Sequence, residues 1–316
     1  KMENFMLKKM KFAPLFLAAF LCAAVPGAWA GRLRVLATTD YIAALAKAVG
    51  GDKVSVDYLS PAGFDADGYS PRPQDIFKVH QAQLFLMIGL NLEDWARDVV
   101  NAANNPHLIK AQIYHGIKLL DKPTGPINYS FGDIHPYGNP HFQTDPEDGG
   151  IMAKNIYQAL VYADPSNQAY YAKNLADFEA RLTKAAARWR AELAPYKGDA
   201  ILPYHESWHY FAEAFGFVDP NPPFTIEEKP GFVPSPRRIE DVIQDGKAAH
   251  VKLVITEPYY DVSIGQAVAK GIGAPCVVIS LYGIGANPKE TDYISMMNVI
   301  VGKVAEALKE GAAHAG

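Results

Sequence analysis

The sequence predicts an α/β protein of two lobes with parallel sheets, joined by one long connecting helix. Short buried apolar runs alternate with helical patterns, which is typical of parallel βαβ units covered on both faces. This alternation occurs twice, on either side of an unusually long helical pattern. We expect a signal peptide at 1–30, an N-terminal lobe at 31–163, the connecting helix at 164–196 and a C-terminal lobe at 197–316.

The first thirty residues have the pattern of an export signal. Three lysines between positions 8 and 11 precede an apolar run over 12–25, and Ala28-Trp29-Ala30 follows. A basic start, an apolar stretch and an Ala-x-Ala end predict cleavage after Ala30. The alternative is a membrane anchor, but the run is shorter than the ~20 residues that a spanning helix needs. We therefore expect a periplasmic protein.

The composition excludes other classes. The chain has two cysteines and a formal net charge of −4. After cleavage only Cys276 remains, so no intramolecular disulfide is expected, and Cys276 should be buried in a strand. Cys22 follows Leu21 rather than a small residue, which argues against a lipoprotein signal. The acidic balance and the lack of a basic cluster argue against a nucleic-acid partner.

The elements of the N-terminal lobe follow from apolar periodicity and from Gly and Pro positions. The first helix, for example, turns Ala43, Leu45, Ala46 and Val49 to one side. The stretch 121–140 is rich in Gly, Pro and Asn and predicts a long loop, and loops of that length are often functional. Strands are predicted at 33–38, 54–59, 84–88 and 117–120, and helices at 40–49, 70–80, 95–101 and 148–162.

The connecting helix begins at Asp164-Pro165, where Asp164 is a plausible cap and Pro165 fits the first helical position. Its apolar residues recur as far as Leu193. The pattern covers about thirty residues, against an ordinary mean of about 11–12, which favours a rigid connector between two lobes. A second series then follows, with strands at 199–203, 251–256 and 276–281 and helices at 207–215, 235–245, 263–270 and 293–309.

Two histidines lie where one element gives way to another. His141 follows Pro140 and precedes a helix, and His205 ends an apolar run where a strand should give way to a helix. Such positions in α/β sheets face the crevice at the carboxyl ends of the strands. Imidazole nitrogen is a preferred donor for zinc and its neighbours. Either residue alone could instead be a hydrogen-bonded structural histidine, and the two can meet only if the lobes face each other.

Carboxylates stand at comparable positions. Glu257 ends the strand 251–256 and points at the same crevice edge, although it could equally cap the following turn. Asp65 and Asp67 lie in a turn-like acidic loop, where carboxylates bind a cation or form Asx turns. We expect His135 to be exposed on its loop, where a ligand role is less favoured.

His205-Glu206-x-x-His209 matches the zinc-peptidase pattern, in which both imidazoles face one way from a single helix. The residues before His205 predict a strand, and Pro203 prevents backward extension of a helix. His209 should then point away from His205. A secreted zinc metallopeptidase, with Glu227 or Glu228 as third ligand, remains the enzyme alternative.

The chain resembles the metal-binding solute receptors of bacterial ABC importers for zinc and manganese, the cluster A-I receptors. The likeness covers nearly the whole mature chain, and its motifs are specific as a set. They are Ala-Thr-Thr39, Gly-Gly-Asp-Lys-Val54, Tyr69-Ser-Pro-Arg-Pro-Gln-Asp75, Asn-Pro-His141 with Asp145-Pro146, His205 with Tyr210-Phe-Ala, Lys229-Pro-Gly-Phe-Val-Pro-Ser235 and Thr256-Glu257-Pro.

The resemblance implies two lobes with a metal between them, and it implies His141 and His205 as the second and third ligands. Asp67 stands where the family has its first ligand, a histidine. The family's last ligand, often an aspartate after the final strand, has no equivalent in Ser280–Gly283, so Glu257 is the nearest replacement. The expected metal ligands are therefore His141, His205, Glu257 and Asp67.

The sequence thus predicts a periplasmic substrate-binding protein that delivers a divalent transition metal to an ABC importer permease. We expect no catalysis and a monomer. Two imidazoles and two carboxylates suit Zn(II), Mn(II) or Fe(II), and intrinsic affinity ranks zinc first and manganese second. The rigid connector predicts a small change of shape on binding.

Overall fold

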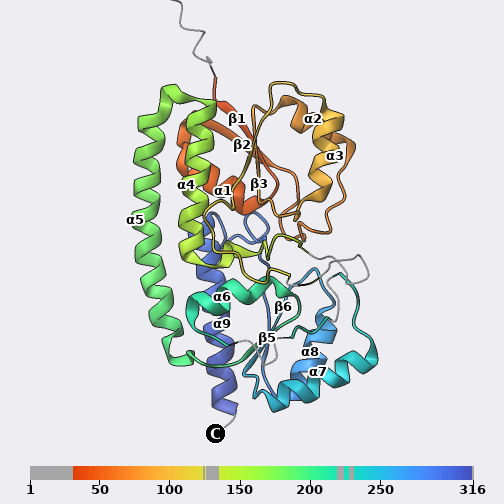
Figure 1. Ribbon diagram of the computed structural model, residues 1–316. Helices are drawn as coiled ribbons and strands as arrows, with labels where there is room; N and C mark the ends of the chain where they lie inside the picture. The colour runs from red at the N-terminus through yellow and green to blue at the C-terminus, as the bar shows by residue number, and fades with distance from the viewer. Residues whose placement is uncertain (1–30, 124, 126–134, 219–223, 228–230, 315–316) are drawn as a thin grey trace, which may run out of the picture. The chain divides into compact units, whose positions relative to one another are not determined.

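Two parallel sheets and two long helices organise the molecule (Figure 1). The computed structural model describes residues 31–123, 125, 135–218, 224–227 and 231–314. The predicted signal peptide lies outside the described residues. Within them, none of the helices has the length and hydropathy needed to cross a bilayer.

The sheet of the N-terminal lobe has the strand order β2-β1-β3-β4, all parallel. Alternate residues of β1 face different cores, since Val35 packs with α1 and α4 whereas Leu36 packs with α2 and α3. Both faces of the sheet are therefore covered, as the apolar runs predict. The elements are β1 (Leu33–Ala37), α1 (Asp40–Gly50), β2 (Val54–Tyr58), α2 (Pro73–Gln81), β3 (Leu84–Met87), α3 (Asp94–Ala103), β4 (Ile109–Gln112) and α4 (Pro146–Ala163).

The predicted strand at 117–120 is wrong. The fourth strand is β4, which lies earlier in the chain and forms one edge of the sheet. Its residues alternate between half-buried and exposed, with Lys110 and Gln112 on the exposed side. An edge strand of this kind has no continuous apolar run, so its pattern was not visible in the sequence.

The sheet of the C-terminal lobe has the order β5-β6-β7, again parallel. Cys276 begins β7 as expected but is only half-buried, so the expectation of a buried thiol is wrong. The elements are β5 (Ile201–Pro203), α6 (His209–Phe215), α7 (Pro236–Ala248), β6 (Leu253–Thr256), α8 (Val262–Ile272), β7 (Cys276–Val278) and α9 (Tyr293–His314).

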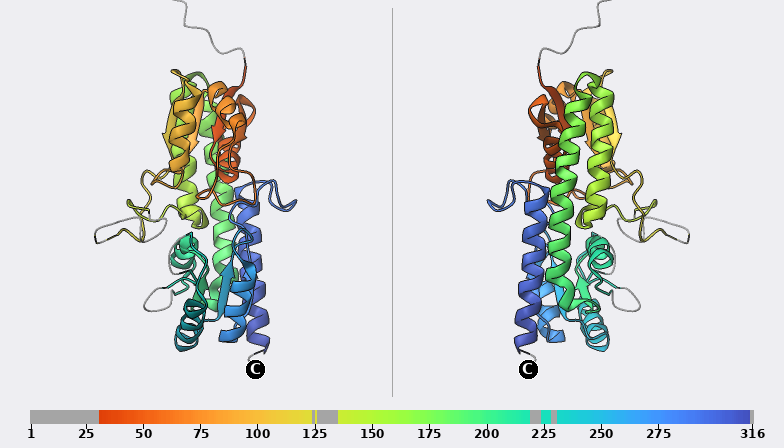
Figure 2. Two further views of the ribbon diagram at one scale, coloured as in Figure 1. Left: turned by 90° about the vertical axis from the view of Figure 1, so that its right-hand side faces the viewer. Right: turned by 90° about the vertical axis from the view of Figure 1, so that its left-hand side faces the viewer.

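The predicted connector is α5 (Gln168–Leu193), a helix of 26 residues. It packs against α1, α4 and α9, and α9 packs in turn against α1, β6 and β7. Figure 2 shows α5 and α9 side by side along the molecule. The two helices therefore belong to both halves of the structure.

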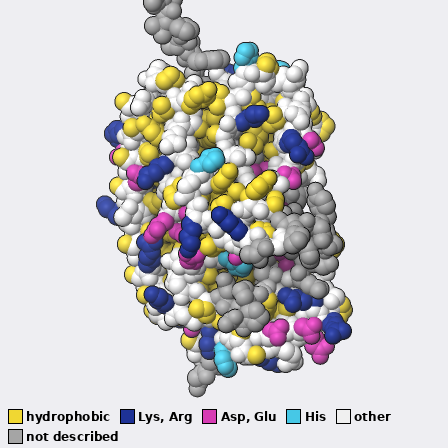
Figure 3. Space-filling view, viewed as in Figure 1, with side chains coloured by type: hydrophobic (Ala, Val, Ile, Leu, Met, Phe, Trp, Pro, Cys, Tyr) yellow, Lys and Arg dark blue, Asp and Glu magenta, His cyan; other side chains and the backbone are white. Residues whose placement is uncertain are grey.

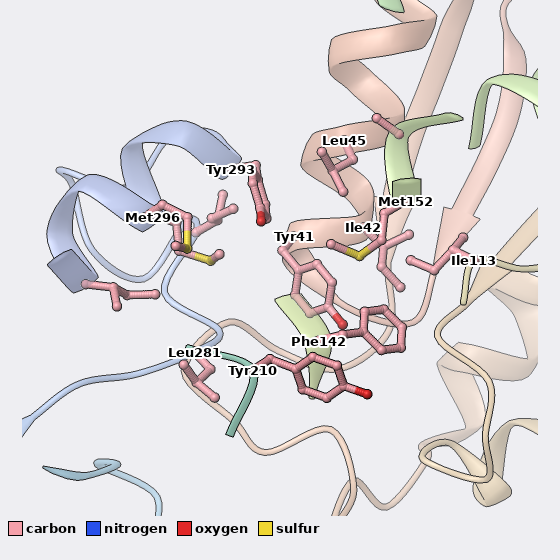
Figure 4. Packing of buried hydrophobic residues seen from close by; sticks show 14 of the residues in the cluster. Tyr41, Ile42, Leu45, Ile113, Phe142, Met152, Tyr210, Leu281, Tyr293 and Met296 are labelled. Atoms are coloured by element: carbon pink, nitrogen blue, oxygen red, sulfur yellow. The ribbon is translucent and has the colours of Figure 1, made fainter. Parts of the chain in front are cut away.

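One hydrophobic core crosses from lobe to lobe. Figure 4 shows Tyr41 and Phe142 of the N-terminal half beside Tyr210 and Leu281 of the C-terminal half. All four are at most 2% exposed. On the face of the surface that Figure 3 shows, Lys and Arg side chains are mixed with Asp and Glu side chains.

Candidate metal site

His141 is fixed by the residue two positions before it. The Asn139 side-chain carbonyl accepts a hydrogen bond from the His141 backbone N–H at 2.9 Å. The Asn139 amide donates to the Glu206 carbonyl at 2.8 Å, and the Tyr210 hydroxyl donates to the Asn139 carbonyl at 2.8 Å. Since Glu206 and Tyr210 belong to the C-terminal lobe, His141 stands at the junction of the lobes, 2% exposed.

His205 leaves the carboxyl end of β5. Its backbone is still extended, with φ −119° and ψ 164°, and a short 3₁₀ turn over Glu206–Trp208 follows. Pairing with β6 continues up to Tyr204, whose N–H donates to the Ile255 carbonyl at 2.8 Å. His205 therefore projects from the crevice edge of the sheet, 3% exposed.

Asp65 and Asp67 do different things. Asp65 Oδ1 accepts from the Asp67 backbone N–H at 3.2 Å, which makes an Asx turn, and Asp65 Oδ2 accepts from the Tyr260 hydroxyl at 3.2 Å. Asp67 Oδ2 instead lies 3.5 Å from His135 Nε2 and 3.7 Å from His141 Nε2. Asp65 thus shapes the loop and Asp67 faces the histidines.

Asp67, His141 and His205 converge on one point. Their ligand atoms all lie within 4.8 Å of one another, and they are the one such group found among the described residues. His141 Nε2 and His205 Nε2 are 3.1 Å apart, with the rings at 86°. A tetrahedral zinc ion holds N and O donors about 3.3 Å apart. This value lies between the 3.1 Å that separates the two Nε2 atoms and the 3.7 Å that separates Asp67 Oδ2 from His141 Nε2. Within the described residues Asp67 Oδ1 is also buried without a hydrogen-bond partner, as a metal ligand would be.

Glu257 is fully buried at the end of β6 but lies outside that group. Its Oε1 accepts from Ser207 Oγ at 2.6 Å and from Trp208 Nε1 at 2.7 Å. These bonds tie the turn after His205 to the neighbouring strand. Glu257 Oε2 has no hydrogen-bond partner within the described residues, so a ligand role for Glu257 stays a prediction.

Two residues matter more than their sequence context indicated. His135 is 3% exposed, so the expectation of an exposed loop histidine is wrong, and its ring centroid lies 5.6 Å from that of His141. Glu227, considered only as a peptidase ligand, is also 3% exposed and accepts a hydrogen bond from His205 Nδ1. Both positions depend on contacts between loops distant in sequence.

Burial and nearby charges, above all that of Glu227, shift the pKa values of the site residues. Burial raises the pKa of Asp67, and the charge of His135 opposes this. Burial holds the pKa of His141 well below its usual value, and the charge of His205 lowers it further. Burial also acts to lower the pKa of His205, but the hydrogen bond and charge of Glu227 outweigh it and raise that pKa above its usual value. Because metal ligands must be deprotonated, His205 would bind a metal as the neutral imidazole.

His205 and His209 do not lie one turn apart on a single helix. His205 precedes the 3₁₀ turn in extended conformation, and α6 begins only at His209. His209 Nδ1 is hydrogen-bonded to Asp121 Oδ2 at 2.6 Å, outside the donor group. The pattern therefore lacks the geometry that a zinc peptidase requires of it.

Similarity to known proteins extends over the same residues. The family model described as "Zinc-uptake complex component A periplasmic" matches residues 35–307. The chain is 28% identical over 289 residues to the manganese ABC transporter substrate-binding lipoprotein PsaA of Streptococcus anginosus, covering 88% of this chain and 90% of that protein. It is 27% identical to the metal ABC transporter substrate-binding lipoprotein FimA of Streptococcus parasanguinis, covering 89% and 90%.

Solved structures agree with the architecture. A crystal structure of ZnuA has a TM-score of 0.73 and 25% identity, covering 88% of this chain and 99% of that one. A metal-free mutant of the periplasmic metal binding protein of Candidatus Liberibacter asiaticus has a TM-score of 0.75 at 20% identity, which bears on the fold alone. It covers 88% of this chain and 100% of its own. Since the family match spans most of the sequence, this chain belongs to the ZnuA family of periplasmic metal-binding receptors.

Proposed function

We propose that this protein is the substrate-binding component of an ABC importer, which captures a divalent transition metal between its lobes and delivers it to a membrane permease. The convergence of Asp67, His141 and His205 in one buried group carries this proposal. The relatives described above are named as metal transporter substrate-binding proteins and support it. The proposed location is the periplasm, reached by cleavage after Ala30, and the proposed state is a monomer.

Zinc is the first proposed cargo and manganese the second. Two imidazole nitrogens and one carboxylate form a donor set that suits zinc, and intrinsic affinity favours zinc over manganese and iron. The family description supports zinc, whereas the PsaA relative is named for manganese. His135 Nε2 lies 3.5 Å from Asp67 Oδ2, and a fourth bond from this nitrogen would strengthen the preference for zinc.

Two measurements test this function. Elemental analysis of protein purified without added metal should find a bound transition metal, and competition titration should show tighter binding of zinc than of manganese. His141→Ala and His205→Ala should each weaken zinc binding strongly, because each removes a buried donor. His107→Ala, which removes an exposed histidine, is the control. Unchanged affinity in either site variant would remove that residue from the donor set.

A further inference from the structure

Glu227 acts on the metal site through His205. Its Oε1 accepts the hydrogen bond from His205 Nδ1, while His205 Nε2 lies 3.1 Å from His141 Nε2. A neutral imidazole that carries its proton on Nδ1 has its only lone pair on Nε2. The contact with Glu227 therefore decides which nitrogen of His205 faces a metal held by the donor group.

The backbone around Glu227 is built to hold this contact. The Glu227 N–H donates to the carbonyl of Tyr204 at 3.2 Å, so Glu227 lies alongside the end of β5, next to His205. The guanidinium of Arg238 in α7 donates to two carbonyls of segment 225–226 at 2.6 and 3.3 Å. Glu227 Oε2 accepts from the Gly231 N–H at 3.3 Å. The backbone bond to Tyr204, the Arg238 guanidinium and the Gly231 N–H together restrict where this carboxylate can be.

We propose that Glu227 is a positioning residue for metal capture, which keeps His205 in its Nδ1-protonated tautomer and aims Nε2 at the ion. The inference rests on the function proposed above. An outer hydrogen bond to a ligating histidine typically changes metal affinity by about 10–100-fold. Glu227 is the one carboxylate that the described residues place against the far nitrogen of His205.

Three variants separate positioning from charge. Glu227→Ala removes both the acceptor and the charge, whereas Glu227→Gln keeps a carbonyl acceptor and removes only the charge. Glu206→Gln is the matched control, because it removes a neighbouring charge that also acts on His205, whereas the carboxylate that is hydrogen-bonded to the ring within the described residues is that of Glu227. Zinc affinity is measured by chelator competition, and the His205 tautomer in the zinc-bound protein by ¹⁵N NMR of labelled histidine.

Glu227→Ala should lower zinc affinity about 10–100-fold and lose the single Nδ1-protonated signal. Glu227→Gln should restore most of both, and Glu206→Gln should behave as the parent. Arg238→Met is a variant that leaves both partners of the His205–Glu227 hydrogen bond in place. It releases segment 225–226, and it should cause a smaller loss of affinity with the same change in tautomer.

Two results overturn the proposal. One is parent-like zinc affinity in Glu227→Ala, and the other is a loss in Glu227→Gln as large as in Glu227→Ala, since charge rather than orientation would then be the cause. Either leaves metal binding by the parent intact. A parent that binds neither zinc nor manganese instead contradicts the proposed function, and with it this inference.

Discussion

Asp40 offers a perturbation whose sign and size follow from the structure. It begins α1 and is 2% exposed. Its Oδ1 accepts from the Tyr41 N–H at 2.7 Å, and its Oδ2 accepts from the Ile284 N–H at 2.8 Å. Ile284 follows β7, so this carboxylate joins the two lobes. Burial raises the pKa of Asp40 from 3.8 to about 7, against the opposing effect of these hydrogen bonds.

The sign of the pH dependence follows from that shift. A carboxyl group whose folded pKa is raised gives stability that is fully present below the unfolded pKa and is lost as pH rises through the folded pKa. A shift of about three units corresponds to a total on the order of 4 kcal/mol, of which about 2 kcal/mol falls between about pH 5 and pH 7. Asp40→Asn abolishes this titration, so its stability should fall less over the same range.

Urea unfolding of metal-free protein at several pH values measures the difference. At the acid end Asp40→Asn should be less stable by about 1–3 kcal/mol, because one of the two buried N–H groups then faces an amide donor. Its pH profile should nevertheless be flatter than that of the parent. Asp52→Asn, an exposed substitution, is the control and should keep the parental slope. Equal slopes for the parent and Asp40→Asn would refute the reasoning.

Three further predictions concern the site and its support. Asp67→His should shift the preference towards zinc over manganese, since nitrogen suits manganese less well than oxygen does; competition titration checks this, and an unchanged ratio would remove Asp67 from the donor set. His209→Ala should keep most of the zinc affinity, and a loss as severe as in His205→Ala would revive the peptidase alternative. Gly149→Ala should destabilise the fold by about 1–3 kcal/mol in urea unfolding, despite a gain of about 1 kcal/mol in helix propensity. The added Cβ would lie 2.4 Å from the buried Tyr293 hydroxyl, and a more stable variant would contradict this.

Most of the fold was visible in the sequence because several of its strands are buried on both faces. The apolar runs of β1, β3 and β6 predicted these strands directly, and the length of its helical pattern predicted α5. Prediction failed at β4, where burial on one side and exposure on the other left only four alternating residues. An edge strand forms by pairing with the neighbouring strand, and the local sequence of the edge strand does not show that partner.

The site was predictable to the extent that its residues end strands or begin helices. His141 and His205 could be singled out because each follows such a boundary, and the structure brings them together with Asp67. The choice between Asp65 and Asp67 required the hydrogen bond from Tyr260, which comes from the other lobe. Glu227 gave no local signal, because its role depends on pairing with the end of β5.

The shared core bears on how a metal enters. Tyr41, Phe142, Tyr210 and Tyr293 are at most 2% exposed and belong to one cluster that crosses the lobe boundary. Exposing four such side chains would cost about 6–12 kcal/mol, comparable to the whole stability of a typical domain at about 5–15 kcal/mol. A wide rotation of one lobe against the other is therefore too costly to accompany each round of capture. Movement is cheaper in the loop that carries Asp65 and Asp67, since of the three consecutive residues 65–67 Ala66 alone belongs to that core.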